Sequence, residues 1–164
     1  MATSAKAFRV LVATDGSEHA RAALATAVNF PWPAHTQVRI VAARRTRAEH
    51  RRSILLSALD RSADAAAESA RRAFSRRWPD VDEVVVDKVP VKGILDEAET
   101  FAADVIVIGW RGHGALRRLL MGSVSRAVVR GAKCSVLVVR RGTRVRRIVG
   151  GVSCYARGST WQPS

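Results

Sequence analysis

Cysteine, aromatic residues and long apolar runs are all scarce in this sequence. Its 164 residues include two cysteines, Cys134 and Cys154, too few for a disulfide framework or a structural zinc site. Aromatic residues make up 5% of the chain although 48% is hydrophobic, so we expect an aliphatic core. No stretch reaches the roughly 18–20 apolar residues of a membrane helix, and residues 1–10 lack the apolar core of a signal peptide. These absences predict a cytoplasmic protein without a membrane partner.

Acidic residues are scarce relative to basic ones. The chain has 28 Lys and Arg against 14 Asp and Glu, a formal net charge of +14. This balance favours polyanionic partners, and nonspecific association with nucleic acid is one function that it allows. Only four of the cations are lysines, and the planar fork of arginine suits phosphate and carboxylate groups. Genome composition alone can also produce the arginine bias, and the sequence has no recognised nucleic-acid motif.

Apolar runs typical of strands alternate with helical patterns along the chain. The expected strands are 8–13, 38–43, 84–89, 104–109 and 134–140, and the expected helices are 18–30, 53–78, 90–102 and 123–131. This alternation predicts an α/β protein with a doubly wound five-stranded parallel sheet, Rossmann-like, and helices on both faces. Ligands of such sheets bind beyond the carboxyl ends of the strands, where the winding reverses.

The chain length is that of one domain, and the alternating pattern fills residues 1–140. Residues 141–144 then read as a linker, and residues 145–153 resemble the first strand at 8–13. We therefore predict one domain at 1–140. Residues 141–164 are either the remnant of a second domain's first strand or a flexible tail.

Glycine is concentrated between the fourth strand and the last helix. Gly109 and Gly112 are followed, after nine intervening residues, by Gly122 and then Ser123. Glycine lets a backbone approach a phosphate without a Cβ clash, and the amides at a helix start attract anions. We expect Ser123 to cap the last helix and Gly131 to end it in a left-handed conformation. The pattern predicts a phosphate-binding segment at this edge of the sheet.

Three segments of the chain together resemble the universal stress protein family. They are Ala13-Thr14-Asp15-Gly16-Ser17 after the first strand, Gly109-x2-Gly112-x9-Gly122-Ser123-Val124-Ser125, and the last strand at 134–140. The likeness covers about residues 8–140, and the glycine pattern is the one carried by the ATP-binding branch. The resemblance implies a stress-response or regulatory protein that binds adenine nucleotide with little or no turnover. It also implies a homodimer and allows a truncated tandem member of the family.

The resemblance assigns site residues position by position. Asp15 would lie beside the adenosine, Ala13 and Thr14 would line its pocket, and the backbone of Ala43 would meet the adenine edge. Ribose and phosphates would be held by Gly109, Gly112, Gly122 and Ser123, with Val124 and Ser125 completing the helix start. The implied ligand is ATP, with or without Mg²⁺. Among the arginines near the glycines, Arg111 is the one that we expect to reach phosphate.

Residue chemistry gives no sign of an enzyme. No paired carboxylates, metal-ligand spacing or Walker-type lysine occurs in the sequence. We therefore assign no catalytic residue and no metal ligand, and expect any ATP hydrolysis to be slow and incidental. Asp15 can accept hydrogen bonds from sugar hydroxyls or an amino group. A role in capping the following helix explains an aspartate at this position equally well, and Ser17 is expected to act as a cap too.

The sequence departs from the family pattern at two positions. Trp110 stands where a small or polar residue is usual, and its indole either stacks on the ligand or blocks the pocket. Lys88 stands where the family places a glycine, shortly before Pro90. Three alternatives to the nucleotide-binding protein follow: a degenerate dimeric copy that binds no nucleotide, a basic nucleic-acid-associated protein, and an enzyme of the related nucleotide hydrolase architecture.

Overall fold

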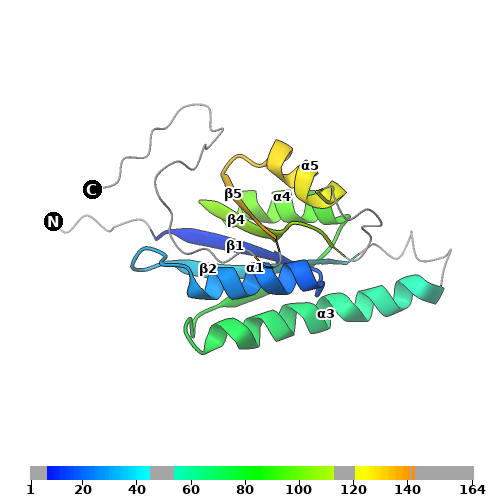
Figure 1. Cartoon of the computed structure of the whole chain (residues 1–164), viewed down its shortest axis with the longest axis horizontal. Coiled ribbons are helices and arrows are strands. Elements are labelled where there is room, and N and C mark those ends of the chain that lie inside the picture. The colour runs from blue at the N-terminus through cyan, green and yellow to red at the C-terminus, as the bar shows by residue number, and fades with distance from the viewer. Residues whose placement is uncertain (1–6, 45–53, 113–120, 141, 143–164) are drawn as a thin grey trace.

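The computed structural model describes residues 7–44, 54–112, 121–140 and 142 (Figure 1). Strands and helices alternate in the expected order. The strands are β1 (Arg9–Thr14), β2 (Gln37–Arg44), β3 (Asp82–Asp87), β4 (Val105–Gly109) and β5 (Ser135–Val139). The helices are α1 (Glu18–Asn29), α3 (Ile54–Ser75), α4 (Pro90–Thr100) and α5 (Ser123–Gly131). Residues 141–164, expected to form a linker and tail, lie outside the described residues except for Gly142.

All five strands form one parallel sheet in the order β3-β2-β1-β4-β5. In the centre, Val10 of β1 is in register with Val38 of β2 on one side and Val105 of β4 on the other. The doubly wound fold predicted from the sequence is therefore confirmed. Because the strand order reverses between β1 and β4, the connections that leave their carboxyl ends diverge to opposite faces of the sheet.

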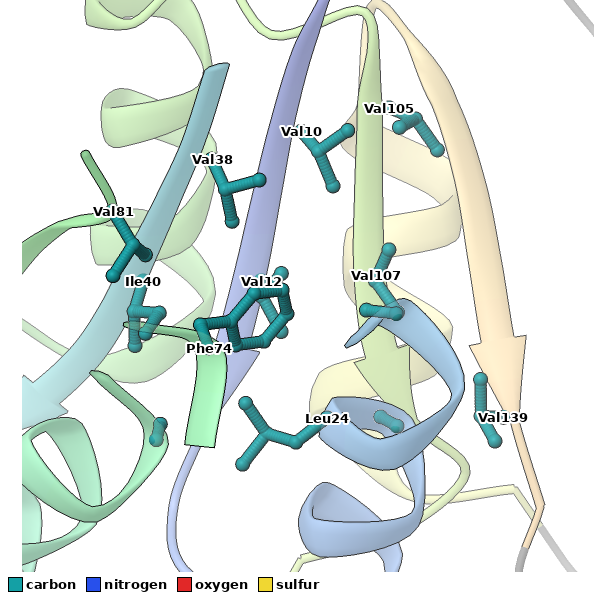
Figure 2. Close-up of a cluster of buried hydrophobic side chains, with 13 residues drawn as sticks. Val10, Val12, Leu24, Val38, Ile40, Phe74, Val81, Val105, Val107 and Val139 are labelled. Atoms are coloured by element: carbon teal, nitrogen blue, oxygen red, sulfur yellow. The ribbon is translucent and has the colours of Figure 1, made fainter. Parts of the chain in front are cut away.

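Helices cover both faces, α1 and α3 on one and α4 and α5 on the other (Figure 1). Strand residues alternate between the two resulting cores, as the pleat of a strand requires. The α1 and α3 side is shown in Figure 2, where Phe74 of α3 and Leu24 of α1 pack over Val12 and Val107. The other core is formed by a second set of aliphatic residues, among them Leu11, Val41, Ile94, Ile106 and Val128. The expected aliphatic core is present.

The third strand begins and ends two residues before the expected range, at Asp82 and Asp87. Its acidic start is held by a contact between strands, because Arg39 of β2 lies 2.7 Å from Asp82. At the other end, Pro90 is the first residue of α4 and Val89 is its N-cap, so the residue before proline is extended but outside the sheet. An ion pair across strands cannot be read from apolar periodicity, which explains the error.

Candidate functional site

The candidate site lies where the chain leaves β1 and β4 at the carboxyl edge of the sheet. This is the point at which the strand order reverses. The turn after β1 and the glycine segment after β4 are joined directly, because the hydroxyl of Ser17 donates a hydrogen bond to the carbonyl oxygen of Arg111 at 3.3 Å. The structure thus brings together two groups of predicted site residues that are more than 90 positions apart in the sequence.

Hydrogen bonds to neighbouring side chains cap the start of α1. The hydroxyl of Ser17, its N-cap, accepts a hydrogen bond from the amide of Ala20 at 3.2 Å. One carboxylate oxygen of Asp15 accepts from the amide of Ser17 at 3.0 Å, in a turn that the positive φ of Gly16 (76°) permits. The expected cap at Ser17 is confirmed. Asp15 orders the turn before the helix and is not the N-cap.

The start of α5, at the same edge, carries no such side-chain cap. Its N-cap is Gly122, which makes no side-chain hydrogen bond, and Ser123 is the first helical residue. The expectation that Ser123 caps the helix is therefore wrong. Gly122 instead donates its amide to the carbonyl of Trp110 at 2.9 Å. Among the described residues no side-chain cap therefore meets the first turn of α5, and the dipole of the helix favours an anion there.

The last residue of α5 also differs from the expectation. Gly131 is helical, the C-cap is Ala132 in an extended conformation, and the glycines with positive φ among the described residues are Gly16 and Gly142. Gly131 is therefore not a left-handed stop. A Cβ placed on it would meet Leu95 of α4, so a close approach of two helices is the structural reason for a glycine at this position.

The three glycines of the motif have three different surroundings. A Cβ on Gly109 would stand 2.7–2.8 Å from backbone atoms of His19 and Ala20 in α1. A Cβ on Gly112 would collide with a carboxylate oxygen of Asp15. A Cβ on Gly122 would stand 3.2 Å from the Cα of Arg111. Gly109 therefore permits helix packing, Gly112 lets the Asp15 carboxylate lie against the glycine segment, and Gly122 permits the approach of α5 to the end of β4.

The side chains of Ser125 and Val124 anchor the first turn of α5. The hydroxyl of Ser125 is buried and lies 2.7 Å from the carbonyl oxygen of Gly109 and 3.3 Å from that of Trp110. The side chain of Val124 packs against the core between the sheet, α4 and α5. These contacts fix the first turn of α5 against the end of β4, so the direction of its amides is set by the scaffold.

Arg111 is buried, with 9% of its surface exposed. The sequence suggested an arginine in a loop, whereas the structure buries this side chain and ties the backbone carbonyl to Ser17 in the turn that follows β1. Charged residues are buried only where other groups compensate them.

The predicted adenosine-side residues lie at the ends of β1 and β2. Ala13 and Thr14 are buried in the last two positions of β1, and the Thr14 hydroxyl accepts a hydrogen bond from Gly16 at 3.3 Å. Ala43 is the second-last residue of β2 and is partly exposed. The strand order separates it from the glycine segment by β1, so the two groups of predicted residues lie on either side of the end of β1.

Trp110 continues the sheet beyond β4. Its amide donates to the carbonyl of Val139 in β5 at 2.7 Å, and its own carbonyl accepts from Gly122. The residue is partly buried. Sequence reasoning did not identify this backbone role, nor the bond from Ser17 to Arg111, because neither has a local sequence signal.

The described part of the chain contains no group of three or more His, Cys, Asp or Glu that could hold a metal ion. No helix in the described ranges is long and apolar enough to cross a membrane. His113, at the end of the glycine segment, lies outside the described residues.

A sequence model of the Universal stress protein family matches residues 7–140. This chain is a universal stress protein. A universal stress protein of Thermus aquaticus is 33% identical over 133 residues, which cover 80% of this chain and 97% of the relative. A Mycobacterium tuberculosis universal stress protein is 31% identical over 137 residues, which cover 80% of this chain and 45% of the relative. One from Methanocaldococcus jannaschii is 42% identical over 57 residues, which cover 35% of this chain and 34% of the relative. The chain thus spans less than half the length of these two relatives in the matches.

Solved structures of the family share the fold. The universal stress protein UspA of Lactobacillus plantarum is 28% identical, with a TM-score of 0.63 over 83% of this chain and 99% of that one. A universal stress protein solved in complex with cAMP is 26% identical, with a TM-score of 0.61 over 80% and 96% of the two chains. The universal stress fold expected from the sequence is thus confirmed, and one structure with this fold holds an adenine nucleotide.

Proposed function

We propose that this universal stress protein binds an adenine nucleotide, with ATP as the physiological ligand, at the carboxyl edge of its sheet. The observation that carries the proposal is the contrast between two helix starts at one edge. Side chains close α1, whereas α5 begins without a side-chain cap beside the glycine segment. An anion would accept hydrogen bonds from the first amides of α5, and phosphate is the anion that glycine-lined helix starts bind.

The rest of the ligand follows from the order of the strands. With phosphates at Gly122, Ser123 and the first amides of α5, the nucleoside extends across the end of β1. There the carboxylate of Asp15 accepts hydrogen bonds from ribose hydroxyls, and Ala13 and Thr14 form the floor. The backbone of Ala43 at the end of β2 meets the base edge. The cAMP-bound relative supports the adenine class.

Binding without chemistry is the activity that the residues support. Asp15 is the one carboxylate among the assigned site residues, and it already accepts the amide of Ser17, so no second acid is assigned to act with it as general acid or base. Any Mg²⁺ is bound by the phosphate oxygens of ATP, with no protein ligand assigned to it. We infer that occupancy of the site, with little or no turnover, is the regulatory signal of a cytoplasmic stress-response protein.

We further propose that the protein works as a homodimer through β5. This strand ends the sheet and pairs only with β4 among the described strands. Its residues Val136, Leu137 and Val138 are apolar, and an apolar edge strand without a partner favours pairing with a second chain. Sedimentation over a range of protein concentrations tests this: a monomer at every concentration would contradict it.

Thermal unfolding with and without nucleotide tests the nucleotide site. A ligand that binds only the folded state raises the melting temperature. Millimolar ATP, AMP and cAMP, each with and without Mg²⁺, are compared with GTP and inorganic phosphate. We expect a rise selective for adenine. An equal rise with every polyanion would overturn the proposal in favour of nonspecific charge binding, and no rise with any of them would indicate a degenerate, blocked site. Phosphate release at many turnovers would indicate an enzyme.

A further inference from the structure

Net positive charge in the described structure is greatest in one stretch of the chain. Residues 7–44 carry four Lys and Arg against two Asp and Glu, and residues 54–112 carry eight against eleven. These parts together have a net charge of −1. Residues 121–140, which form α5 and β5, carry four cations and no acid. This unit therefore carries the largest net positive charge of the three parts, +4 against +2 for residues 7–44 and −3 for residues 54–112.

The cations of this unit lie on its outer side. Arg126 and Arg130 are both exposed and stand four residues apart in α5, so they share one face of the helix about 5–6 Å apart at Cβ. Neither forms a salt bridge with a described residue, and the guanidinium of Arg126 donates to the backbone oxygen of Met121 at 3.3 Å. Lys133, two residues after α5, and Arg140, directly after β5, are also exposed, although Lys133 is paired with Glu99 at 2.9 Å.

We propose that this basic face, formed by Arg126 and Arg130 of α5, binds the phosphate backbone of a nucleic acid duplex without sequence specificity. It lies on the opposite side of the sheet from α3 (Figure 1). A duplex presents one negative charge per roughly 1.7 Å of axis, so two guanidiniums on one helical face each meet a phosphate. The nucleotide site uses the first-turn amides of α5 and not these side chains.

The composition of the unit selects a duplex over other polyanions. Residues 121–140 contain no aromatic residue, so they lack the stacking platforms that bind single strands. Helices that lie on membranes bury an apolar face in the lipid, but in α5 the apolar side chains of Val124 and Val128 pack into the protein core. Charge complementarity with a regular phosphate backbone remains.

Fluorescence anisotropy of a labelled 20-base-pair duplex of arbitrary sequence, titrated with the full chain at several KCl concentrations, tests this proposal. The double variant Arg126→Gln/Arg130→Gln removes two contacts, so the slope of log K against log [KCl] should fall in magnitude by about 1.8. The control is Arg76→Gln/Arg77→Gln, which removes the same charge from exposed positions after α3 and should keep the slope of the wild type.

The outcomes separate this proposal from its competitors. An equal decrease of the slope in both variants would show that net charge acts without a defined face and would overturn the proposal. A wild type that does not bind the duplex would overturn it as well. Binding of phosphatidylserine vesicles in place of the duplex, lost in the α5 variant, would indicate a membrane surface. Because the α5 variant should retain its melting temperature and the rise produced by ATP, failure here is distinguishable from failure of the nucleotide site.

Discussion

Replacing Gly109 by alanine should destabilise the fold itself. Its new methyl group would stand 2.7–2.8 Å from backbone atoms of His19 and Ala20, against 3.4–4 Å for ordinary contacts. Backbone cannot rotate away as a side chain can, so α1 must shift by about 0.6 Å or more from β4. Overpacking of this kind costs about 1–3 kcal/mol. Alanine also lowers the conformational entropy of the unfolded chain, which stabilises the folded state by about 0.4–1 kcal/mol. We expect a net loss of about 1–2 kcal/mol.

Urea unfolding followed by circular dichroism measures this loss. The midpoint should fall at an unchanged m-value, and the melting temperature should fall by about 2–8 °C. Gly131→Ala is the matched control. Its Cβ would meet only the flexible end of Leu95, 2.7 Å away, and that side chain borders a cavity of about 230 Å³ into which it can move. The control should be neutral or stabilised by up to about 1 kcal/mol. A Gly109→Ala protein as stable as this control would refute the packing argument.

Three further predictions concern single side chains. Ser17→Ala removes the cap of α1 and should lower the free energy of unfolding by about 1 kcal/mol; an unchanged urea midpoint would contradict this. The ammonium of Lys88 lowers the pKa of Asp96, so the Asp96 carboxylate contributes stability above its unfolded pKa and loses it as the pH falls through the lower folded value. Lys88→Met should therefore raise that pKa in an NMR titration, and an unmoved pKa would disprove the pairing. Burial raises the pKa of the Cys134 thiol. In a Cys154→Ser background, Cys134 should therefore be alkylated more slowly at neutral pH in the folded protein than in the protein unfolded by urea. Equal alkylation rates would count against its burial.

The order of the elements could be predicted because each carries its own signal. The run from Val105 to Ile108 is apolar on both faces and lies at the centre of the sheet, and Pro90 begins α4 as expected. The start of β3 was misplaced because Arg39 pairs with Asp82 across strands, and its end because Val89 is the N-cap of α4. Apolar periodicity locates an element, whereas contacts with neighbouring elements decide its limits.

The place of the site could also be predicted, but not its internal contacts. The glycine spacing and the reversal of strand order both point to the segment after β4. The start of α5 depends on the bond from Gly122 to Trp110, and the backbone of Arg111 is held by its bond from Ser17. Both are tertiary contacts between segments that local patterns describe separately.

The dissociation constant of ATP for the wild type, Gly112→Ala and Gly131→Ala, measured side by side by calorimetry, tests the central claim most directly. A methyl group on Gly112 displaces the carboxylate of Asp15, which we place on the ribose, while Gly131 lies at the far end of α5. Losing a hydrogen bond to a charged group weakens binding about tenfold or more. We predict that loss for Gly112→Ala and wild-type affinity for Gly131→Ala. Equal affinity in all three proteins, or no binding in any, would contradict the account.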